Sequence, residues 1–532
     1  MPQTRSFERR TMKNRNKTSN RRTFLRKLNA LSIGAFAVSP TQLVLADQFS
    51  DDRRLPNVSH GVSIGDISAD KAVIWSRADR PSQMIVEVSS DATFKQSRKI
   101  IGPEVLEHSD FTGKVILQEL FDADYLHYRV SFRDLDQRKK VGAAVTGRAR
   151  LLRQQSQDIT FAWSGDTAGQ GFGIDEARGG MQTYQAMQKM EPDFFVHSGD
   201  VCYADGPFAS EIKMDDGSTW KNIVTESTRK VAETLGEFRA NFRYNLLDKH
   251  VRNFNSTVPV FAQWDDHETV NNWFPGEQLT NDDRYTIKSV SLLAARARQA
   301  FFDYMPIRPS ASRQIYRKIA RGSLLELFFL DLRSYKGPNT KNNQAAQSAT
   351  SNYFGGSQLS WLKQQLKSCR STWKFICSDM PIGLIVADGE NFENNANGDG
   401  PPLGRELEVA ELLRFIKEQE IKNVVFITAD VHYAASHYYD PNAATFTDFK
   451  PFWEFVSGPL HAGTFGPNKL DNTFGPQVKF CSVSETMKPN RPPSAGLQFF
   501  GFVEIDSQTK VATVSHYNRN GEKLWQTDLQ PE

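Results

Sequence analysis

Six short apolar runs between residues 158 and 430 each end in aspartate. They are ITFAWSGD, DFFVHSGD, VPVFAQWDD, LELFFLD, WKFICSD and VVFITAD, which end at Asp166, Asp200, Asp265 and Asp266, Asp331, Asp379 and Asp430. A carboxylate that follows a buried strand lies at the carboxyl end of that strand, where the ligand sites of α/β sheets gather. If the carboxylates converge, their repulsion must be neutralised, and multivalent cations are the usual solution. The alternative is a set of unrelated turn residues, because Asp also begins turns.

Two kinds of metal ligand can be distinguished in this part of the chain. Tyr203 follows Asp200 at the third position, and one loop can turn both side chains toward one point. With Asp166 and the imidazole of His432, they would form a ligand set that suits Fe³⁺. The remaining candidates offer only oxygen, which favours Ca²⁺, Mg²⁺ or Mn²⁺ over Zn²⁺, and the flexible loops and many carboxylates favour Ca²⁺. These candidates are Asp266, Asp379 and Asp430.

The elements that must position these residues fall into two groups. Residues 55–150 contain KAVIWSRA, QMIVEVSS and HYRVSFRD, which are typical of strands and predict a small antiparallel β-sandwich. From residue 158 onward, short apolar runs alternate with amphipathic stretches, and this pattern predicts an α/β layered domain. The C-terminal segments GLQFFGFVEID, KVATVSHY and EKLWQTDL are typical of successive antiparallel strands. The amphipathic stretches are 181–190, 289–304, 359–369 and 405–420.

The first 46 residues differ in charge from the rest of the 532-residue chain. They hold ten Lys and Arg residues and one Glu, whereas the remainder holds 55 basic and 61 acidic residues and has a net charge of −6. Because the basicity is confined to this leader, no nucleic-acid-binding patch is expected. Arg21 and Arg22 precede Phe24, Leu25 and a modestly apolar stretch, and this order resembles a twin-arginine export signal.

The leader predicts where the protein acts. Residues 1–46 are expected to be a signal peptide that engages the twin-arginine export machinery, so the mature protein would be periplasmic or secreted. A disordered basic tail followed by a short helix is the alternative. No segment approaches the ~18 apolar residues of a membrane helix, so no span is expected in the mature form. Because this route resembles one used by proteins that fold around a metal before export, a cofactor loaded in the cytoplasm is expected.

Five motifs occur in a specific order along the chain: GDTAGQG, HSGDVCYADG, WDDHETVNNW, SDMPIG and ADVHYAASH. Together with the N-terminal GVSIGDISADKAVIWSR, they resemble the PhoD-type alkaline phosphatases of the calcineurin-like metallophosphoesterase superfamily over most of residues 57–520. The resemblance implies an N-terminal antiparallel β-sandwich domain, 55–150, followed by an α/β/α-layered metallophosphoesterase domain, 155–532, with two central sheets. It also implies a ferric ion, one or two calcium ions, and hydrolysis of phosphate mono- and diesters at alkaline pH after export.

The resemblance assigns the iron ligands residue by residue. Asp200 of the GDxxY motif would bridge the metals, and Tyr203 and His432 would bind iron. Asp166 is a departure, because some PhoD-type enzymes carry a cysteine in this motif. Since Asp166 matches the wider superfamily instead, iron should still bind, but with a harder ligand set.

The resemblance also points to a calcium site. Asp266 stands where the superfamily usually has the Asn of its Gly-Asn-His-Glu motif. Asp379 and Asp430 stand where many relatives have metal-binding histidines. Carboxylates at these three positions are the change that a calcium site requires.

The resemblance further implies an in-line attack on phosphorus by a metal-activated hydroxide. His267 follows Asp266 and would stabilise charge or act as general acid, with a histidine hydrogen-bonded within its loop as the alternative. Asn271 and Asn272 could donate to a phosphate oxygen, supply a calcium ligand or cap the loop. HETVN lacks the second histidine of a zinc-protease motif, and no Walker loop or GxSxG elbow is present.

Two other functions remain open at this stage. A phospholipase D-like phosphodiesterase could use the same scaffold, because the walls of the pocket decide between mono- and diesters. A non-catalytic calcium- or phosphate-binding surface protein with a degenerate site belongs to a different class. The presence of both His267 and Tyr203 argues against it, since a binding module needs neither.

Overall fold

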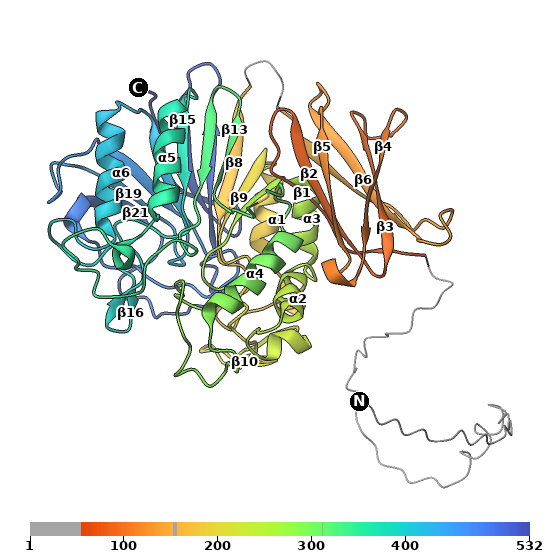
Figure 1. The fold of residues 1–532 in the computed structure, drawn as a ribbon, viewed down its shortest axis with the longest axis horizontal. Helices are drawn as coiled ribbons and strands as arrows, with labels where there is room; N and C mark the ends of the chain where they lie inside the picture. The colour runs from red at the N-terminus through yellow and green to blue at the C-terminus, as the bar shows by residue number, and fades with distance from the viewer. Residues whose placement is uncertain (1–54, 153–156, 311) are drawn as a thin grey trace, which may run out of the picture. The chain divides into compact units, whose positions relative to one another are not determined.

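Two large β-sheets form the centre of the computed structural model, which describes residues 55–152, 157–310 and 312–532 (Figure 1). The signal peptide predicted at 1–46 lies outside the described residues. In the described part of the chain, the larger sheet has nine strands. In spatial order they are β24 (Lys523–Leu529), β23 (Ala512–Asn518), β22 (Phe499–Ile505), β8 (Ile159–Ser164), β9 (Phe194–Ser198), β12 (Val260–Gln263), β1 (Val58–Gly65), β2 (Lys71–Ala78) and β5 (Thr112–Gln118).

The second large sheet has seven described strands. Its order is β13 (Arg317–Arg321), β14 (Leu325–Phe329), β15 (Trp373–Cys377), β18 (Val424–Thr428), β20 (Phe452–Val456), β19 (Ala435–Tyr439) and β21 (Pro476–Cys481). In both sheets the central strands are parallel: β8, β9 and β12 in one, and β14, β15, β18 and β20 in the other. Their carboxyl ends therefore lie along one side of each sheet, as the aspartate pattern requires.

The two sheets pack face to face through aromatic side chains. Phe161 of β8 meets Phe375 of β15 edge-on at 5.4 Å between ring centroids, and Phe261 of β12 meets Phe329 of β14 at 6.0 Å. These residues belong to one buried apolar cluster that also includes the N-terminal strands. The near-continuous apolar runs of the sequence follow from this arrangement, because each parallel strand is covered on both faces.

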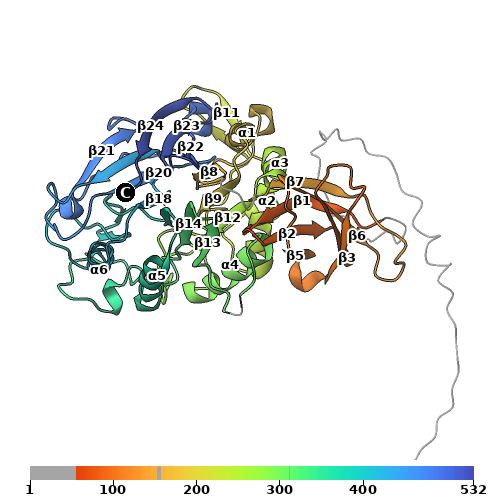
Figure 2. The ribbon, with the colours of Figure 1, turned by 90° about the horizontal axis from the view of Figure 1, so that it is seen from above.

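Helices cover the outer faces of both sheets. Those of the nine-stranded sheet are α1 (Gln182–Lys189), α2 (Leu235–Asn245), α3 (Lys249–Thr257) and α4 (Val290–Tyr304). Those of the seven-stranded sheet are α5 (Gly356–Ser368) and α6 (Glu406–Glu418), which lie side by side in Figure 2. The predicted α/β layers with two central sheets are thus confirmed, and none of the described helices is long and apolar enough to cross a membrane.

The N-terminal strands form the predicted β-sandwich, but one of its layers is shared. Its own sheet consists of β4 (Arg98–Val105), β3 (Ser82–Ser89), β6 (Tyr125–Arg133) and β7 (Val145–Arg150). The other layer, β1, β2 and β5, continues into the nine-stranded sheet, where β1 pairs with β12 at Gly65 and Val260. The domain boundary predicted between residues 150 and 155 falls between β7 and β8, and it stays a prediction.

Asp66 stabilises the junction between β1 and the second large sheet. It follows β1, is fully buried, and pairs with Arg317 of β13 at 2.8 Å, so it links the sandwich to the second large sheet. Its carboxylate also accepts the backbone N–H of Arg308 at 2.9 Å. The backbone of Gly65 passes so close to Val260 and Pro306 that a Cβ at this position would collide with both.

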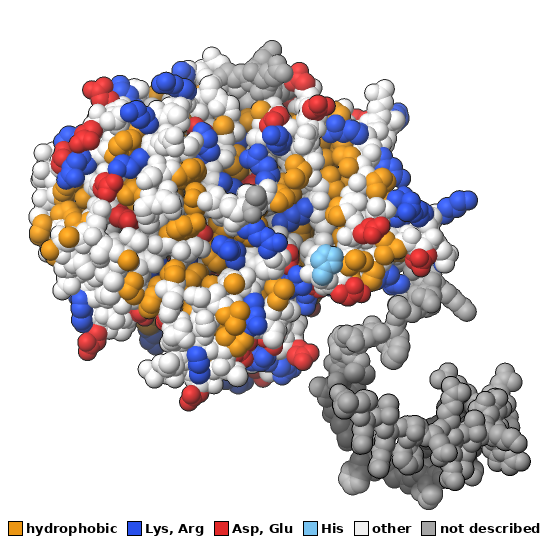
Figure 3. All heavy atoms as spheres, in the orientation of Figure 1, with side chains coloured by type: hydrophobic (Ala, Val, Ile, Leu, Met, Phe, Trp, Pro, Cys, Tyr) orange, Lys and Arg blue, Asp and Glu red, His pale blue; other side chains and the backbone are white. Residues whose placement is uncertain are grey.

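Basic and acidic side chains are interspersed on the face drawn in Figure 3. Neither sign gathers there over a large area, so this face presents no strong field of one sign.

Candidate metal centre

The acidic residues predicted from the sequence follow the central strands as expected. Each comes within three residues of the carboxyl end of β8, β9, β12, β14, β15 or β18. Several of these residues have positive φ angles, a conformation that costs a non-glycine residue energy and that persists at functional sites when the surroundings enforce it. These are Asp166 at 64°, Asp200 at 51°, Asp430 at 70° and His432 at 62°.

The predicted iron ligands lie together. Oxygen and nitrogen atoms of Asp166, Asp200 and His432 lie within 4.8 Å of one another. The hydroxyl of Tyr203 lies 3.0 Å from Nε2 of His432. Nδ1 of the same imidazole lies 2.5 Å from the carbonyl of Gly463, which accepts its proton and leaves Nε2 as the ligand atom.

Two further clusters extend from the first. Asp200, Asp266 and His267 form one, so Asp200 is shared with the iron-type cluster. Asp265, Asp266 and Asp430 form the other, and Asp266 connects it to the second. This third cluster contains carboxylate oxygens only, which are the ligands that calcium prefers.

Two predicted aspartates do not join a cluster. Asp379 is fully buried and neither of its carboxylate oxygens has a hydrogen-bond partner, but it is not part of the three groups. Asp331 accepts the indole N–H of Trp264 at 2.7 Å and the backbone N–H of Ser334 at 3.0 Å. Asp331 therefore positions the loop after β12, whereas both oxygens of Asp379 lack a hydrogen-bond partner.

The pKa values of the clustered carboxyl groups reflect their burial and their mutual repulsion. Burial is the main cause that raises the pKa of the clustered carboxyls well above their usual range, and neighbouring carboxylates add to it. The groups affected are Asp166, Asp200, Asp379 and Asp430. Burial would also raise the pKa of Asp266, but His267 and Arg333 hold it well below its usual value. Buried oxygens of Asp166, Asp266 and Asp430 lack partners, so the donor set fits bound cations.

The two histidines of the site differ in charge. Burial lowers the pKa of His432 to about 4, so its imidazole is neutral and suited to a metal. Burial would lower the pKa of His267 too, but Asp205, Asp266 and Asp200 raise it well above its usual value. These carboxylates therefore favour the protonated imidazole of His267, which is the form that a general acid requires.

Several supporting residues were missed from the sequence. Asp205 lies 2.8 Å from Nδ1 of His267 and accepts the backbone N–H of Asn271 at 2.8 Å. Glu268 accepts the backbone N–H groups of Val201 at 2.6 Å and Asp265 at 2.9 Å, and so ties the loops after β9 and β12 together. Both lie in the motifs HSGDVCYADG and WDDHETVNNW, and their position next to predicted ligands could have indicated a supporting role.

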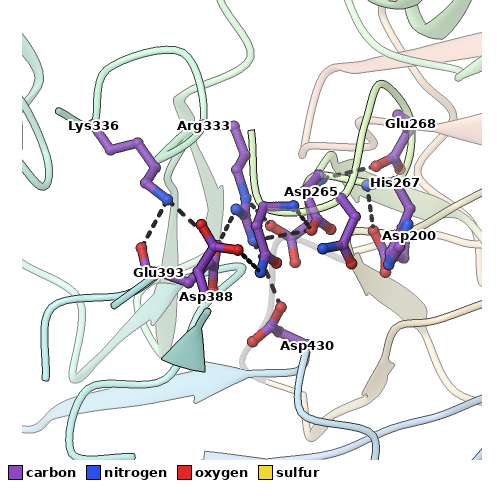
Figure 4. A network of polar contacts seen from close by, with 12 residues as sticks. Asp200, Asp265, His267, Glu268, Arg333, Lys336, Asp388, Glu393 and Asp430 are labelled. Atoms are coloured by element: carbon purple, nitrogen blue, oxygen red, sulfur yellow. Dashed lines mark hydrogen bonds and ion pairs between the residues drawn. The ribbon is translucent and has the colours of Figure 1, made fainter. Parts of the chain in front are cut away.

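Arg333 is the cation built into the acidic cluster (Figure 4). Its Nε lies 2.5 Å from Asp265, and another of its nitrogens contacts Glu393. Its second Nη lies 3.6 Å from Asp430 and 3.8 Å from Asp266, beyond hydrogen-bond distance of either. Arg333 is completely buried, so it neutralises the surrounding carboxylates and does not face the solvent.

Arg333→Met should therefore destabilise the protein strongly. Removal of the guanidinium leaves Asp265 buried without its cation and leaves Glu393 with Lys336 alone, at 3.4 Å. Loss of one partner costs about 3–5 kcal/mol in comparable buried pairs. The free energy of unfolding, measured by urea denaturation without added metal, checks this. Arg414→Met is the control, because Arg414 pairs with Asp448 at the surface, where a far smaller loss is expected. Equal losses in the two variants would show that Arg333 does not hold the cluster.

A pocket opens onto the clusters. Its volume is about 240 Å³, and its lining includes Asp200, Asp266, His267, Asp430 and His432. Asn271 and Asn272 line it as well, and the N–H of Asn272 donates to Asp266 at 2.5 Å. The remaining lining residues are Gln170, Val386, Val431, Phe465 and Asn468.

Two face-to-face sheets with clustered metal-ligand residues at the ends of their parallel strands define a metallophosphoesterase. The family comparison agrees: residues 161–516 match the model of the PhoD-like phosphatase, and residues 44–152 match the PhoD-like phosphatase, N-terminal domain. The chain belongs to the PhoD-like phosphatase family and is a metal-dependent phosphoesterase.

Individual relatives agree with this assignment. The chain is 25% identical to alkaline phosphatase D of Bacillus subtilis (strain 168) over 503 residues, which cover 86% of this chain and 79% of that protein. A solved structure of PhoD superposes with a TM-score of 0.65 at 19% identity, covering 88% of this chain and 92% of the other. The structure of purple acid phosphatase PPD1 from yellow lupin (Lupinus luteus) seeds superposes with a TM-score of 0.53 at 12% identity, covering 90% of this chain and 74% of the other. These two structures share the fold.

Proposed function

We propose that the protein is an exported alkaline phosphatase that hydrolyses phosphate mono- and diesters at a centre of Fe³⁺ and Ca²⁺. The observation that carries the proposal is the sharing of Asp200 and Asp266 between adjacent clusters. Asp200 links the iron-type set to the middle cluster, and Asp266 links the middle cluster to the oxygen-only set, so this chain of clusters could hold two cations side by side. Both shared residues also line the open pocket, so a phosphate group could reach the metals.

The donor sets support one assignment of the metals. Asp166, Asp200, Tyr203 and His432 would hold Fe³⁺, because a carboxylate, phenolate and imidazole set suits this ion. Asp266 and Asp430, together with Asp265, would hold Ca²⁺ through oxygen alone. Asp379 would complete the calcium site through its unpartnered oxygens.

The bound metals would activate water and neutralise charge on the phosphoryl oxygens. His267 would donate a proton to the leaving oxygen. Asp205 accepts a hydrogen bond from Nδ1, so Nε2 is the nitrogen that remains for this transfer. Asn271, held by its backbone N–H on Asp205, would orient a phosphoryl oxygen through its side chain. Phe465 and Val386 would limit the access of bulk water to the pocket.

One experiment tests the whole proposal. Elemental analysis of the purified protein is combined with rate measurements on a panel of phosphate mono- and diesters at alkaline pH. Iron and calcium together with hydrolysis of both ester types support it. Zinc alone, or bound metals without any hydrolysis, contradicts it.

The phenolate of Tyr203 makes a spectroscopic prediction. Burial and the nearby Asp200 and Asp166 raise the pKa of Tyr203 well above 10 in the absence of metal, whereas bound Fe³⁺ would ionise it. The iron-loaded protein should therefore be coloured, and Tyr203→Phe should lose the visible band at matched iron content. Tyr184→Phe is the control, because the Tyr184 hydroxyl contacts Thr167 instead. A Tyr203→Phe protein with an unchanged band would remove Tyr203 from the ligand set.

Export can be tested at the paired arginines. Changing Arg21 and Arg22 to lysine should leave the activity in the cytoplasm, because the twin-arginine machinery reads this pair. Arg9 and Arg10 form a second pair in the same leader, and the same change there is a matched control that should leave export intact. Activity that still reaches the periplasm or medium after the first change would refute the predicted route. Fractionation followed by an ester-hydrolysis assay measures the outcome.

A further inference from the structure

A second pocket lies next to the metal pocket. Its volume is about 410 Å³, and it is lined by Ile212 and Lys213 of β10 (Glu211–Lys213), by the turn that follows this strand, and by residues between 488 and 495. Phe172, Ile212 and Pro492 supply apolar surface, whereas Lys213, Lys488 and Arg491 supply positive charge.

The segment from Gly463 to Phe465 connects the linings of the two pockets. On one side, Phe465 lines the metal pocket and the carbonyl of Gly463 accepts from His432. On the other, Thr464 and Arg491 exchange two backbone hydrogen bonds of 2.9 Å. A side-chain hydrogen bond also connects the two pockets. Asn490 of the second pocket donates to the carbonyl of Gln170, a residue of the metal pocket, at 3.3 Å.

The charges of the second pocket do not cancel. Asp215 faces both Arg491 at 3.3 Å and Lys488 at 3.5 Å, so one carboxylate serves two cations. Lys213 is held by a neutral partner, Thr219, at 2.8 Å. The other carboxylate of the pocket, Asp216, already accepts the N–H of Ser218 at 2.9 Å. Three cations against two carboxylates leave the pocket with a positive charge beside an apolar surface.

We propose that this pocket binds the leaving group of the substrate, and that the preferred substrate is a phosphate ester whose alcohol carries a second anionic group on an apolar body. The proposal rests on the proposed function, because the phosphate to be cleaved would lie at the metals. Arg491 is the main anchor, since its half-buried guanidinium is weakly paired and can form a charge-assisted hydrogen bond with an anion.

The test uses two esters of the same shape that differ in the distant charge. 4-(Carboxymethyl)phenyl phosphate and 4-(carbamoylmethyl)phenyl phosphate have phenol leaving groups of similar acidity, and homologues with longer methylene spacers extend the reach of the carboxylate. The wild-type protein should show a kcat/KM about two- to fivefold higher for the carboxylate member, as one partly exposed ion pair provides. The preference should fall as salt is added.

Variants locate the preference. Arg491→Gln should bring the ratio of the two kcat/KM values to about one. Lys213→Gln, at an exposed position where folding is not at risk, should reduce the ratio. Lys99→Gln removes an exposed charge on β4 and should leave the ratio unchanged. Equal wild-type rates for every pair of esters, or a preference that survives both pocket variants, would overturn the proposal. Failure of the proposed function looks different, because neither member of a pair would then be hydrolysed.

Discussion

His267→Ala should lower kcat by about 10²–10⁴-fold, the range typical of one acid–base group. The reason is structural: His267 is held by Asp205, keeps its proton and lines the metal pocket. The loss should be large for alkyl phosphates, whose leaving oxygen needs a proton. It should be small for 4-nitrophenyl phosphate, whose phenolate leaves without one.

Metal content must be measured for the same variant, because His267 also lies in a candidate metal cluster. Unchanged iron and calcium with the leaving-group dependence just described would identify a general acid. A loss of metal would make His267 a ligand instead. Equal losses for both leaving groups at unchanged metal content would make it a stabiliser of charge on the phosphoryl group. Asp205→Asn is the companion variant, and it should show the same dependence with a smaller loss, because the imidazole remains but is less well oriented.

Removal of calcium should abolish turnover. The third cluster offers only carboxylate oxygens, so a calcium-selective chelator should empty it, and Ca²⁺ should restore activity better than Zn²⁺. Asp430→Asn should raise the calcium concentration needed for half-maximal activity. Full activity in a chelated sample, or rescue by Zn²⁺ alone, would contradict the oxygen-only site.

Asp331→Asn is the matched control for the calcium experiment. Asp331 follows a central strand as Asp430 does, but its carboxylate binds Trp264 and Ser334. The calcium concentration that the Asp331→Asn variant needs for half-maximal activity should therefore equal that of the wild-type protein. A raised requirement in this variant would mean that the chelation result reports on the general integrity of the strand ends.

The fold could be predicted from the sequence where the pattern was local. Apolar runs that end in Asp mark parallel strands covered on both faces, and the amphipathic stretches 181–190 and 405–420 correspond to α1 and α6. The helix α2 was missed because its apolar period is weak. The helix α3 was missed because it has only nine residues, of which His250, Val251 and Phe254 are buried. The pairing of β1 with β12 joins residues far apart in the chain, and no local pattern reports it.

The same distinction applies to the site. Strand periodicity placed Asp166, Asp200 and Asp430 at one side of the sheets. The structure has Asp166 and Asp200 in one cluster and Asp430 in another, which Asp266 links to Asp200 through the middle cluster. Periodicity does not fix side-chain partners, so the pairing of Arg333 with Glu393, 60 residues apart, was not foreseen. The position of Asp379 outside the three clusters also depends on how its loop turns.

The shared sheet limits how the protein can be divided. A fragment that begins after β7 would lack β1, and the backbone of β12 would become an uncovered edge able to pair with a second molecule. Arg317 would lose Asp66, so a cation that is now paired in the interior would stand alone. The sandwich is therefore part of the cooperative folding unit, and catalytic fragments without it should aggregate rather than fold.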